Sequence, residues 1–184
     1  MTSDEKLVVA AQEAPEGDTR AFDALVVRHQ ERVLANCRYL SGSADDAHDL
    51  AQEVFVKAFF GLERFQGRSQ FGSWVQRIKV NHCLNHLRKR KGKSFLELDD
   101  PTLCSAVELQ SHASTERDVG HRDMRDRIRT VLDAMPDTLR VPLIMCDLDG
   151  FSYQEIADSL ELGLSAVKMR IKRAREEFRR LYRE

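Results

Sequence analysis

A chain of 184 residues can form one domain or two small ones, and its 29 Lys and Arg residues nearly balance its 30 Asp and Glu residues. A uniform charge balance of this kind would argue against nucleic-acid binding, but here the basic residues cluster. The sequence opens without the basic-then-apolar pattern of a secretory signal, and no apolar run approaches a membrane span. We therefore expect a cytoplasmic protein without membrane insertion.

The first forty residues predict one strong helix. Residues 1–20 are polar and acidic and predict a weak helix at best. From Thr19 to Leu40 apolar side chains recur at helical spacing, which is typical of a long amphipathic helix. These side chains are Phe22, Leu25, Val26, Val33, Leu34 and Cys37. The small residues 41–43 end this helix.

A second helix is predicted from Ser43 or Ala44 to about Phe60, with an apolar face and an acidic face. Asp45, Asp49 and Glu53 follow one another at four-residue intervals, so they form one stripe. The stripe has two interpretations. It is either solvated charge that also favours the helix N-terminus, or a docking face for a basic or polar partner.

A loop over residues 61–70 and a third helix from Phe71 follow. The helix ends in a basic run, Arg88-Lys-Arg-Lys-Gly-Lys93, with more charge than the helix C-terminus requires. Aromatic residues stand shortly before this run, and that pairing suits single-stranded nucleic acid, where bases stack and phosphates are neutralised. For Trp74, packing in the core is the favoured interpretation.

Cysteine and histidine residues predict no metal site and no cofactor. The four cysteines (Cys37, Cys83, Cys104, Cys146) form no CxxC pair, so we expect reduced thiols, several of them in helix cores. His82 and His86 share a helix face and could hold a metal with Cys83 nearby. However, Cys83 projects about 100° away from His82 on a helix, and a fourth ligand is missing.

Residues 94–121 change in character. They carry six acidic residues and one basic residue, Arg117, and they show little apolar periodicity. This composition predicts a flexible acidic linker. We therefore divide the chain into a first domain over residues 1–93, the linker, and a second domain over residues 122–184.

The second domain begins with a helix through Met124, Ile128, Val131, Leu132 and Met135. Pro136 restarts the chain, and a further helix reaches Leu148 with a predicted kink at Pro142.

The last forty residues predict a helix-turn-helix. Ser152 and Glu155 form a capping box for a short helix that ends near Leu160. Residues 161–163 form the turn, where Gly163 is able to take a left-handed conformation. A second helix, capped by Ser165, has an apolar stripe and leaves five side chains pointing outward: Lys168, Met169, Lys172, Arg173 and Arg175.

An ordinary helical hairpin with a solvated face would also fit this pattern. The sign of the charge favours DNA binding, because residues 168–183 hold eight Lys or Arg and only Glu176 and Glu177 against them. The whole chain is predicted to be all-α, with two small helical domains joined by the flexible acidic linker. It carries no catalytic motif, so we do not expect an enzyme.

Over nearly its whole length the chain resembles the extracytoplasmic-function (ECF) group of bacterial RNA polymerase sigma factors. Residues 49–55, Asp-Leu-Ala-Gln-Glu-Val-Phe, resemble the helix that binds core polymerase. Phe71-Gly-Ser-Trp74 and the residues after it resemble the segment that melts and reads the −10 promoter element. Met135-Pro136, Arg140 and the stretch 150–157 resemble the −35-binding domain.

The resemblance implies three sets of functional residues. Core polymerase, through the clamp helices of its β′ subunit, would be bound by Asp45, Asp49, Gln52, Glu53 and Phe55. The −10 DNA would be bound by Arg64, Phe65, Ser69, Trp74, Arg77, Asn81, Asn85 and Arg88, and the loop 62–70 would capture a flipped base. The −35 DNA would be bound by Ser165, Lys168, Met169, Lys172 and Arg173.

The implied function is that of a transcription initiation factor that directs polymerase to promoters. Its implied partners are core RNA polymerase, including the β and β′ subunits, promoter DNA and an anti-sigma factor. Two rivals stay open at this point: a helix-turn-helix regulator that acts without polymerase, and a metal-responsive sensor using His82, Cys83 and His86. The acidic stripe and the aromatic and basic segment near Trp74 argue against the first.

Overall fold

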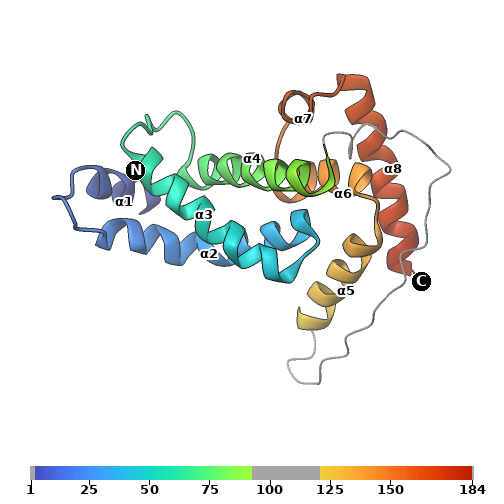
Figure 1. Ribbon diagram of the computed structural model, residues 1–184, viewed down its shortest axis with the longest axis horizontal. Helices are drawn as coiled ribbons and strands as arrows, with labels where there is room; N and C mark the ends of the chain where they lie inside the picture. The colour runs from blue at the N-terminus through green and yellow to red at the C-terminus, as the bar shows by residue number, and fades with distance from the viewer. Residues whose placement is uncertain (1–2, 93–120, 184) are drawn as a thin grey trace. The chain divides into compact units, whose positions relative to one another are not determined.

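The computed structural model describes residues 3–92 and 121–183, and every regular element in these ranges is a helix (Figure 1). The predicted all-α class is confirmed. The chain divides into two compact units, residues 1–90 and 91–184. The predicted linker lies outside the described residues, apart from His121, which begins a helix.

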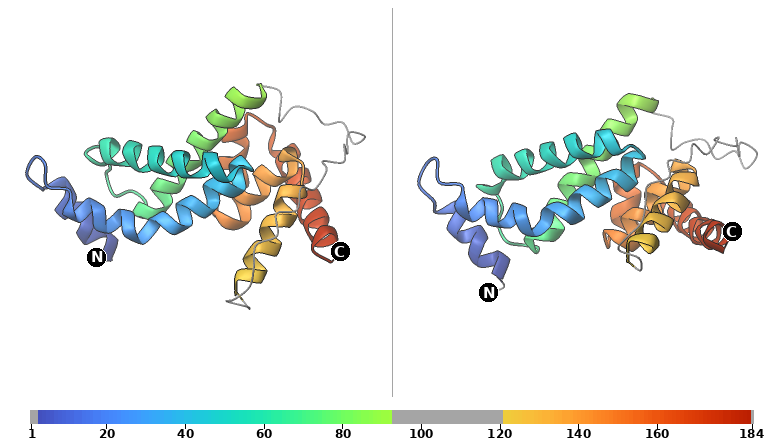
Figure 2. Two further views of the ribbon diagram at one scale, coloured as in Figure 1. Left: turned by 60° about the horizontal axis from the view of Figure 1, so that its bottom comes forward. Right: turned by 90° about the horizontal axis from the view of Figure 1, so that it is seen from below.

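The first unit contains α1 (Ser3–Gln12), α2 (Arg20–Ser41), α3 (Ala44–Leu62) and α4 (Phe71–Lys91). Figures 1 and 2 show α2 and α3 side by side. Its core is built from fully buried apolar side chains of three helices: Leu25, Val33, Cys37, Leu40, Val54, Ala58, Val75, Val80, Cys83 and Leu87. Helical periodicity in α2 and α3 therefore marks the core face correctly.

Local chemistry explains how α2 ends and α3 begins. Gly42 follows α2 with φ 66, a left-handed conformation that glycine adopts at little cost, and its N–H donates to the Arg38 carbonyl. The next residue, Ser43, accepts a hydrogen bond from the Asp46 N–H at 3.2 Å and so caps α3. Helix α3 then continues to Leu62, two residues beyond the predicted end.

The N-terminal residues form a better helix than the sequence predicts. Helix α1 buries Val8, and the Asp4 carboxylate lies 2.9 Å from both Arg28 Nη1 and His29 Nε2 on α2. These contacts with α2 stabilise a segment whose own helical signal is weak, since tertiary packing contributes most of the stability of short helices. The sequence predicts no more than a weak helix here, and the structure has a ten-residue helix.

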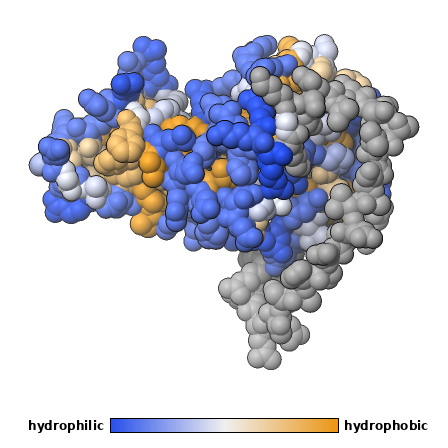
Figure 3. Space-filling view, viewed as in Figure 1, coloured by the Kyte–Doolittle hydropathy of each residue, from blue (hydrophilic) through white to orange (hydrophobic). Residues whose placement is uncertain are grey.

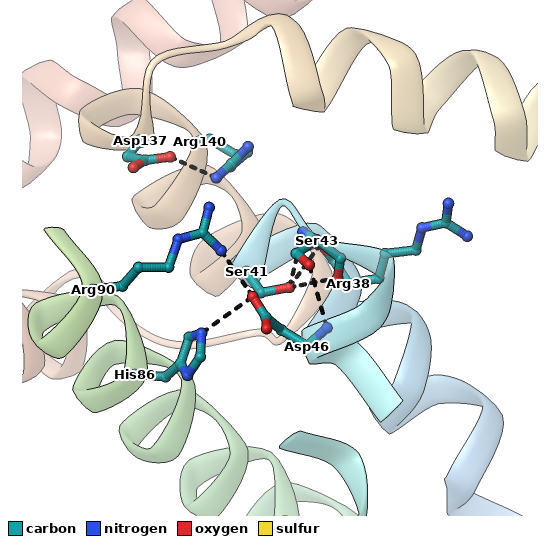
Figure 4. A network of polar contacts seen from close by, with 8 residues as sticks. All are labelled: Arg38, Ser41, Ser43, Asp46, His86, Arg90, Asp137 and Arg140. Atoms are coloured by element: carbon teal, nitrogen blue, oxygen red, sulfur yellow. Dashed lines mark hydrogen bonds and ion pairs between the residues drawn. The ribbon is translucent and has the colours of Figure 1, made fainter. Parts of the chain in front are cut away.

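The second unit contains α5 (His121–Ala134), α6 (Asp137–Leu143), η2 (Ile144–Leu148), α7 (Tyr153–Leu160) and α8 (Leu164–Arg183). At Pro142, where the sequence predicts a kink, the helix changes type: η2 is a π-helical turn, in which the Asp149 N–H donates to the Ile144 carbonyl at 3.1 Å. Within α6 the buried Arg140 pairs with Asp137 (Figure 4).

The helix-turn-helix is present, and its capping box is confirmed. The Ser152 hydroxyl accepts from the Glu155 N–H, and the Glu155 carboxylate accepts from the Ser152 N–H at 2.9 Å. Two details of the turn differ from prediction. Glu161, and not Gly163, takes the left-handed conformation (φ 57), because the residue that closes an α-helix end is the one directly after its last turn.

Ser165 does not cap α8. The helix begins at Leu164, and the Val167 N–H donates to the Gly163 carbonyl, so Ser165 lies inside the first turn.

One ion pair joins α8 to η2. Arg175 was predicted to point outward, but its guanidinium donates two hydrogen bonds to the Asp147 carboxylate, at 2.6 and 3.1 Å. Hydrogen bonding from Arg175 lowers the pKa of Asp147. The positive charge of Arg175 therefore pairs with a carboxylate of the same unit. In the described ranges, no helix has the length and apolar character needed to cross a membrane.

We predict that Ser152→Ala destabilises α7, because its helix N-terminus loses a cap worth about 1 kcal/mol. Hydrogen exchange of the full chain would show amides of α7 exchanging about fivefold faster if this cap limits local opening. Ser152→Thr, which keeps an accepting hydroxyl, is the matched control. Unchanged exchange in Ser152→Ala would show that α7 is held by packing alone.

The Asp147–Arg175 pair predicts a pH dependence of stability. Because the folded pKa of Asp147 is lowered, its contribution is complete above the ordinary Asp pKa of about 3.9 and is lost as the pH falls through the folded value. Near pH 7, Asp147→Asn should lower the free energy of unfolding by up to about 1 kcal/mol, since the pair is half-exposed.

This difference should shrink on acidification below that ordinary value and should be absent in an Arg175→Gln background. Denaturant titrations of the four variants at several pH values measure it. A difference that stays constant at all pH values would mean that the pair contributes through packing.

Candidate polymerase and nucleic-acid interfaces

The acidic residues of α3 divide into an inward and an outward part. Asp46 faces α4, where its Oδ2 atom lies 2.8 Å from Arg90 Nη1 and 3.3 Å from His86 Nε2 (Figure 4). Burial alone would raise the pKa of Asp46, but hydrogen bonds from Ser43 and His86, together with the charges of His86 and Arg90, lower it. Asp46 therefore holds α3 against α4 as a carboxylate.

The outward part contains the residues predicted to bind polymerase. Asp45, Asp49, Gln52 and Glu53 are exposed, and Phe55 is half-buried. Glu53 Oε2 lies 2.9 Å from His82 Nε2 of α4. Burial lowers the pKa of His82 more than the Glu53 carboxylate raises it. Near pH 7 the imidazole is therefore neutral and does not offset the Glu53 charge.

The same geometry bears on the metal-sensor hypothesis. His82 and His86 face two different carboxylates, Glu53 and Asp46, and Cys83 points into the core, with its Sγ 3.8 Å from that of Cys37. Cys83 thus lies in the core, apart from the carboxylate partners of the two histidines. Among the described residues, no group of three His, Cys, Asp or Glu side chains is arranged to hold a metal ion.

Three aromatic rings gather where the loop after α3 meets the start of α4. The ring centroid of Trp74 lies 4.8 Å from that of Phe65 and 5.8 Å from that of Phe71. Phe71 is buried, whereas Phe65 and Trp74 are half-buried and keep part of their surface open to solvent. Trp74 also lies against Gly61, where an added Cβ would be 3.2 Å from the indole. The sequence favours core packing for Trp74, and this holds for only part of the ring, since the rest stays open to solvent.

The remaining residues predicted to bind −10 DNA lie on this loop and on one face of α4. Arg64 is exposed and Ser69 half-buried in the loop. On α4, Arg77, Asn81 and Asn85 are exposed at four-residue intervals, and Arg88 falls on the same face. Arg90, counted in the basic run, is instead paired with Asp46. The face thus offers two amides and two guanidinium groups in one row.

On α8 the five predicted DNA-binding residues lie together. Ser165, Lys168, Met169, Lys172 and Arg173 are all exposed, and the side chains that alternate with them are buried. The burial of Arg170 is not predicted by the sequence, because this charged residue stands among exposed basic residues although it lies on the apolar face of α8. The exposed set can donate hydrogen bonds to phosphates and base edges, as a recognition helix does.

Comparisons with known proteins agree with this arrangement. Residues 25–93 match the family model for sigma-70 region 2, and residues 125–178 match that for sigma-70 region 4. The chain is 33% identical to the RNA polymerase sigma-H factor of Pseudomonas aeruginosa, over 94% of this chain and 90% of the relative. It is 32% identical to the ECF RNA polymerase sigma-E factor of Escherichia coli, over 91% and 90%.

Two solved structures are similar in fold. CnrH in complex with the cytosolic domain of CnrY aligns with a TM-score of 0.60 and 25% identity, over 98% of this chain and 97% of that one. The sigma factor RpoE of Bartonella quintana, in complex with the anti-sigma factor NepR, aligns with a TM-score of 0.62 and 25% identity, over 89% and 98%. Together with the two family matches, these relatives show that the chain belongs to the ECF group of the sigma-70 family of RNA polymerase sigma factors.

Proposed function

We propose that the chain binds core RNA polymerase through the outward face of α3, opens and reads the −10 element with the loop 63–70 and α4, and anchors at the −35 element with α8. The observation that carries this proposal is a row of polar side chains on α4, from Arg77 to Arg88. The row begins beside the half-buried rings of Phe65 and Trp74. Unpaired bases can both stack and form hydrogen bonds on such a surface, whereas the bases of duplex DNA are already stacked and paired.

Charge and apolar surface on α3 support a protein partner. Asp45, Asp49 and Glu53 present three carboxylates that can attract and orient a basic surface such as the clamp helices of β′. Farther along the helix three large apolar side chains are exposed: Val56, Phe59 and Phe60, the last of them 76% exposed. Figure 3 shows hydrophobic surface over the part of the first unit that holds α1, α2 and α3.

At the −10 element the first unit must recover the free energy of base extrusion, which is a few kcal/mol. Phe65 and Trp74 offer ring surface for stacking, and Asn81 and Asn85 can donate and accept hydrogen bonds on base edges. Arg77 and Arg88 on the same face neutralise phosphates.

At the −35 element α8 reads duplex DNA in the major groove. Arg173 can donate two hydrogen bonds to guanine, Lys168 and Lys172 can reach phosphates or bases, and Met169, which is 50% exposed, can contact a thymine methyl group. Arg175 takes no part, because Asp147 holds its guanidinium.

An anti-sigma factor is the proposed regulator. The support is that the similar RpoE structure contains the anti-sigma factor NepR, and that the exposed apolar side chains on α3 would be covered by such a partner. Purification of the protein from its native cells before induction should recover it bound to a second, non-polymerase protein. Recovery always free, or bound to polymerase alone, would contradict this proposal.

For core docking we predict that Asp49→Lys/Glu53→Lys abolishes co-purification of core polymerase with the tagged chain, because two attractive charges become repulsive. Glu16→Lys/Glu31→Lys makes the same charge change at exposed positions outside the stripe and should retain capture. Capture that persists in the first variant would contradict the docking face. Absence of capture by the unmodified chain, with duplex binding intact, would favour a regulator that acts without polymerase.

For the −35 element we predict that Arg173→Ala weakens binding of the polymerase complex to promoter duplex by about 1–3 kcal/mol and relaxes specificity at one base pair. Arg175→Ala is the matched control, since its charge is used inside the unit, and it should leave base specificity unchanged. Binding titrations against a set of single base-pair changes measure both effects. An equal loss by Arg173→Ala on all sequences would make Arg173 a phosphate contact.

A further inference from the structure

One side chain of α1 reaches the loop that we assign to base capture. Gln12, the last residue of α1, donates hydrogen bonds from its Nε2 atom to the Leu62 carbonyl at 2.8 Å and to the Phe65 carbonyl at 2.9 Å. These partners lie 50 and 53 residues away in the sequence. Gln12 also precedes the region 2 match, which begins at residue 25.

The two accepting carbonyls belong to one turn, in which the Phe65 N–H also donates to the Leu62 carbonyl at 3.0 Å. Leu62 is the final residue of α3, where backbone carbonyls lack partners within the helix. Phe65 belongs to the loop, and its ring packs on Trp74. A primary amide has two N–H donors, and here both are used, so one side chain ties the end of α3 to the backbone of the aromatic residue.

The other end of α1 is fixed to the same aromatic cluster by a second route. Asp4 contacts Arg28 and His29 on α2, each at 2.9 Å. The His29 ring lies 5.4 Å from the ring of Phe71, and Phe71 contacts both Phe65 and Trp74. Gly72 lies so close to His29 that an added Cβ would be 3.1 Å from the imidazole. Helix α1 thus supports the cluster from two sides.

We propose that Gln12 is a positioning residue for base capture, which holds the loop 63–70 in the conformation that receives the extruded base. The inference rests on the proposed function of that loop. A loop that already has its bound conformation loses less entropy on binding, so a residue that orders it strengthens capture without touching DNA. Gln12 should therefore affect the captured base and leave core docking unchanged.

The size of the effect follows from the two hydrogen bonds. Hydrogen bonds from an exposed side chain contribute modestly, so losing both should weaken affinity by only about threefold to tenfold. Gln12→Met is the test variant, because methionine keeps the length of the side chain and removes both donors. Gln30→Met is the matched control, since Gln30 is an exposed glutamine on α2.

The experiment uses polymerase reconstituted from core and the full chain. Its probe is a short single-stranded DNA, selected from a randomised pool by the unmodified complex, together with a series in which each base in turn is replaced by an abasic site. The abasic position that weakens binding most identifies the captured base. The ratio of the two affinities, intact over abasic, then measures capture in each variant.

We expect Gln12→Met to lower affinity for the intact probe about threefold to tenfold, to leave affinity for the abasic probe unchanged, and so to reduce the ratio. Gln30→Met should keep the full ratio, and all variants should bind core polymerase equally. An unchanged ratio in Gln12→Met, or an equal loss on both probes, would overturn the positioning role. If no abasic position weakened binding by the unmodified complex, base capture itself would fail, and that is a different result.

Discussion

The first unit depends on the Asp46 carboxylate, which joins the capped start of α3 to α4. The Asp46 N–H donates to Ser43, and its carboxylate faces His86 and Arg90 at 3.3 and 2.8 Å. Because these contacts fix one side of α3 against α4, Asp49 and Glu53 must face outward. The row on α4 through Asn81 is likewise left exposed. The Asp46 carboxylate thus helps to orient two surfaces with different proposed partners, the outer face of α3 and the polar face of α4.

Helical periodicity predicts most of this architecture because the core is continuous along each helix. The spacing of Leu25, Val33 and Cys37 on α2 marks fully buried positions, and on α8 it marks Lys168 and Met169 as exposed. The exposure of the assigned residues on the outer faces of the helices, such as Asp49, Asn81 and Lys172, follows from the same spacing. Their roles stay predictions, since exposure alone does not name a partner.

What the sequence could not predict depends on long-range pairing or on exact turn geometry. Helix α1 is stabilised by contacts such as Asp4 with Arg28 and Gln12 with Leu62, and no periodic pattern announces a partner 24 or 50 residues away. Arg175 has a visible charge, but its use by Asp147 requires the packing of α8 on η2. In the turn, the end of α7 decides which residue becomes left-handed, and Glu161 takes that place although a glycine follows closely.

The lowered pKa of His82 has a consequence for the charge on the outer face of α3. An imidazole with its ordinary pKa beside Glu53 would gain a proton on mild acidification and would cancel one negative charge of the α3 face. Burial of His82 delays that protonation to a lower pH. The negative charge of Glu53 is therefore not offset by His82 until a lower pH than an ordinary imidazole would allow.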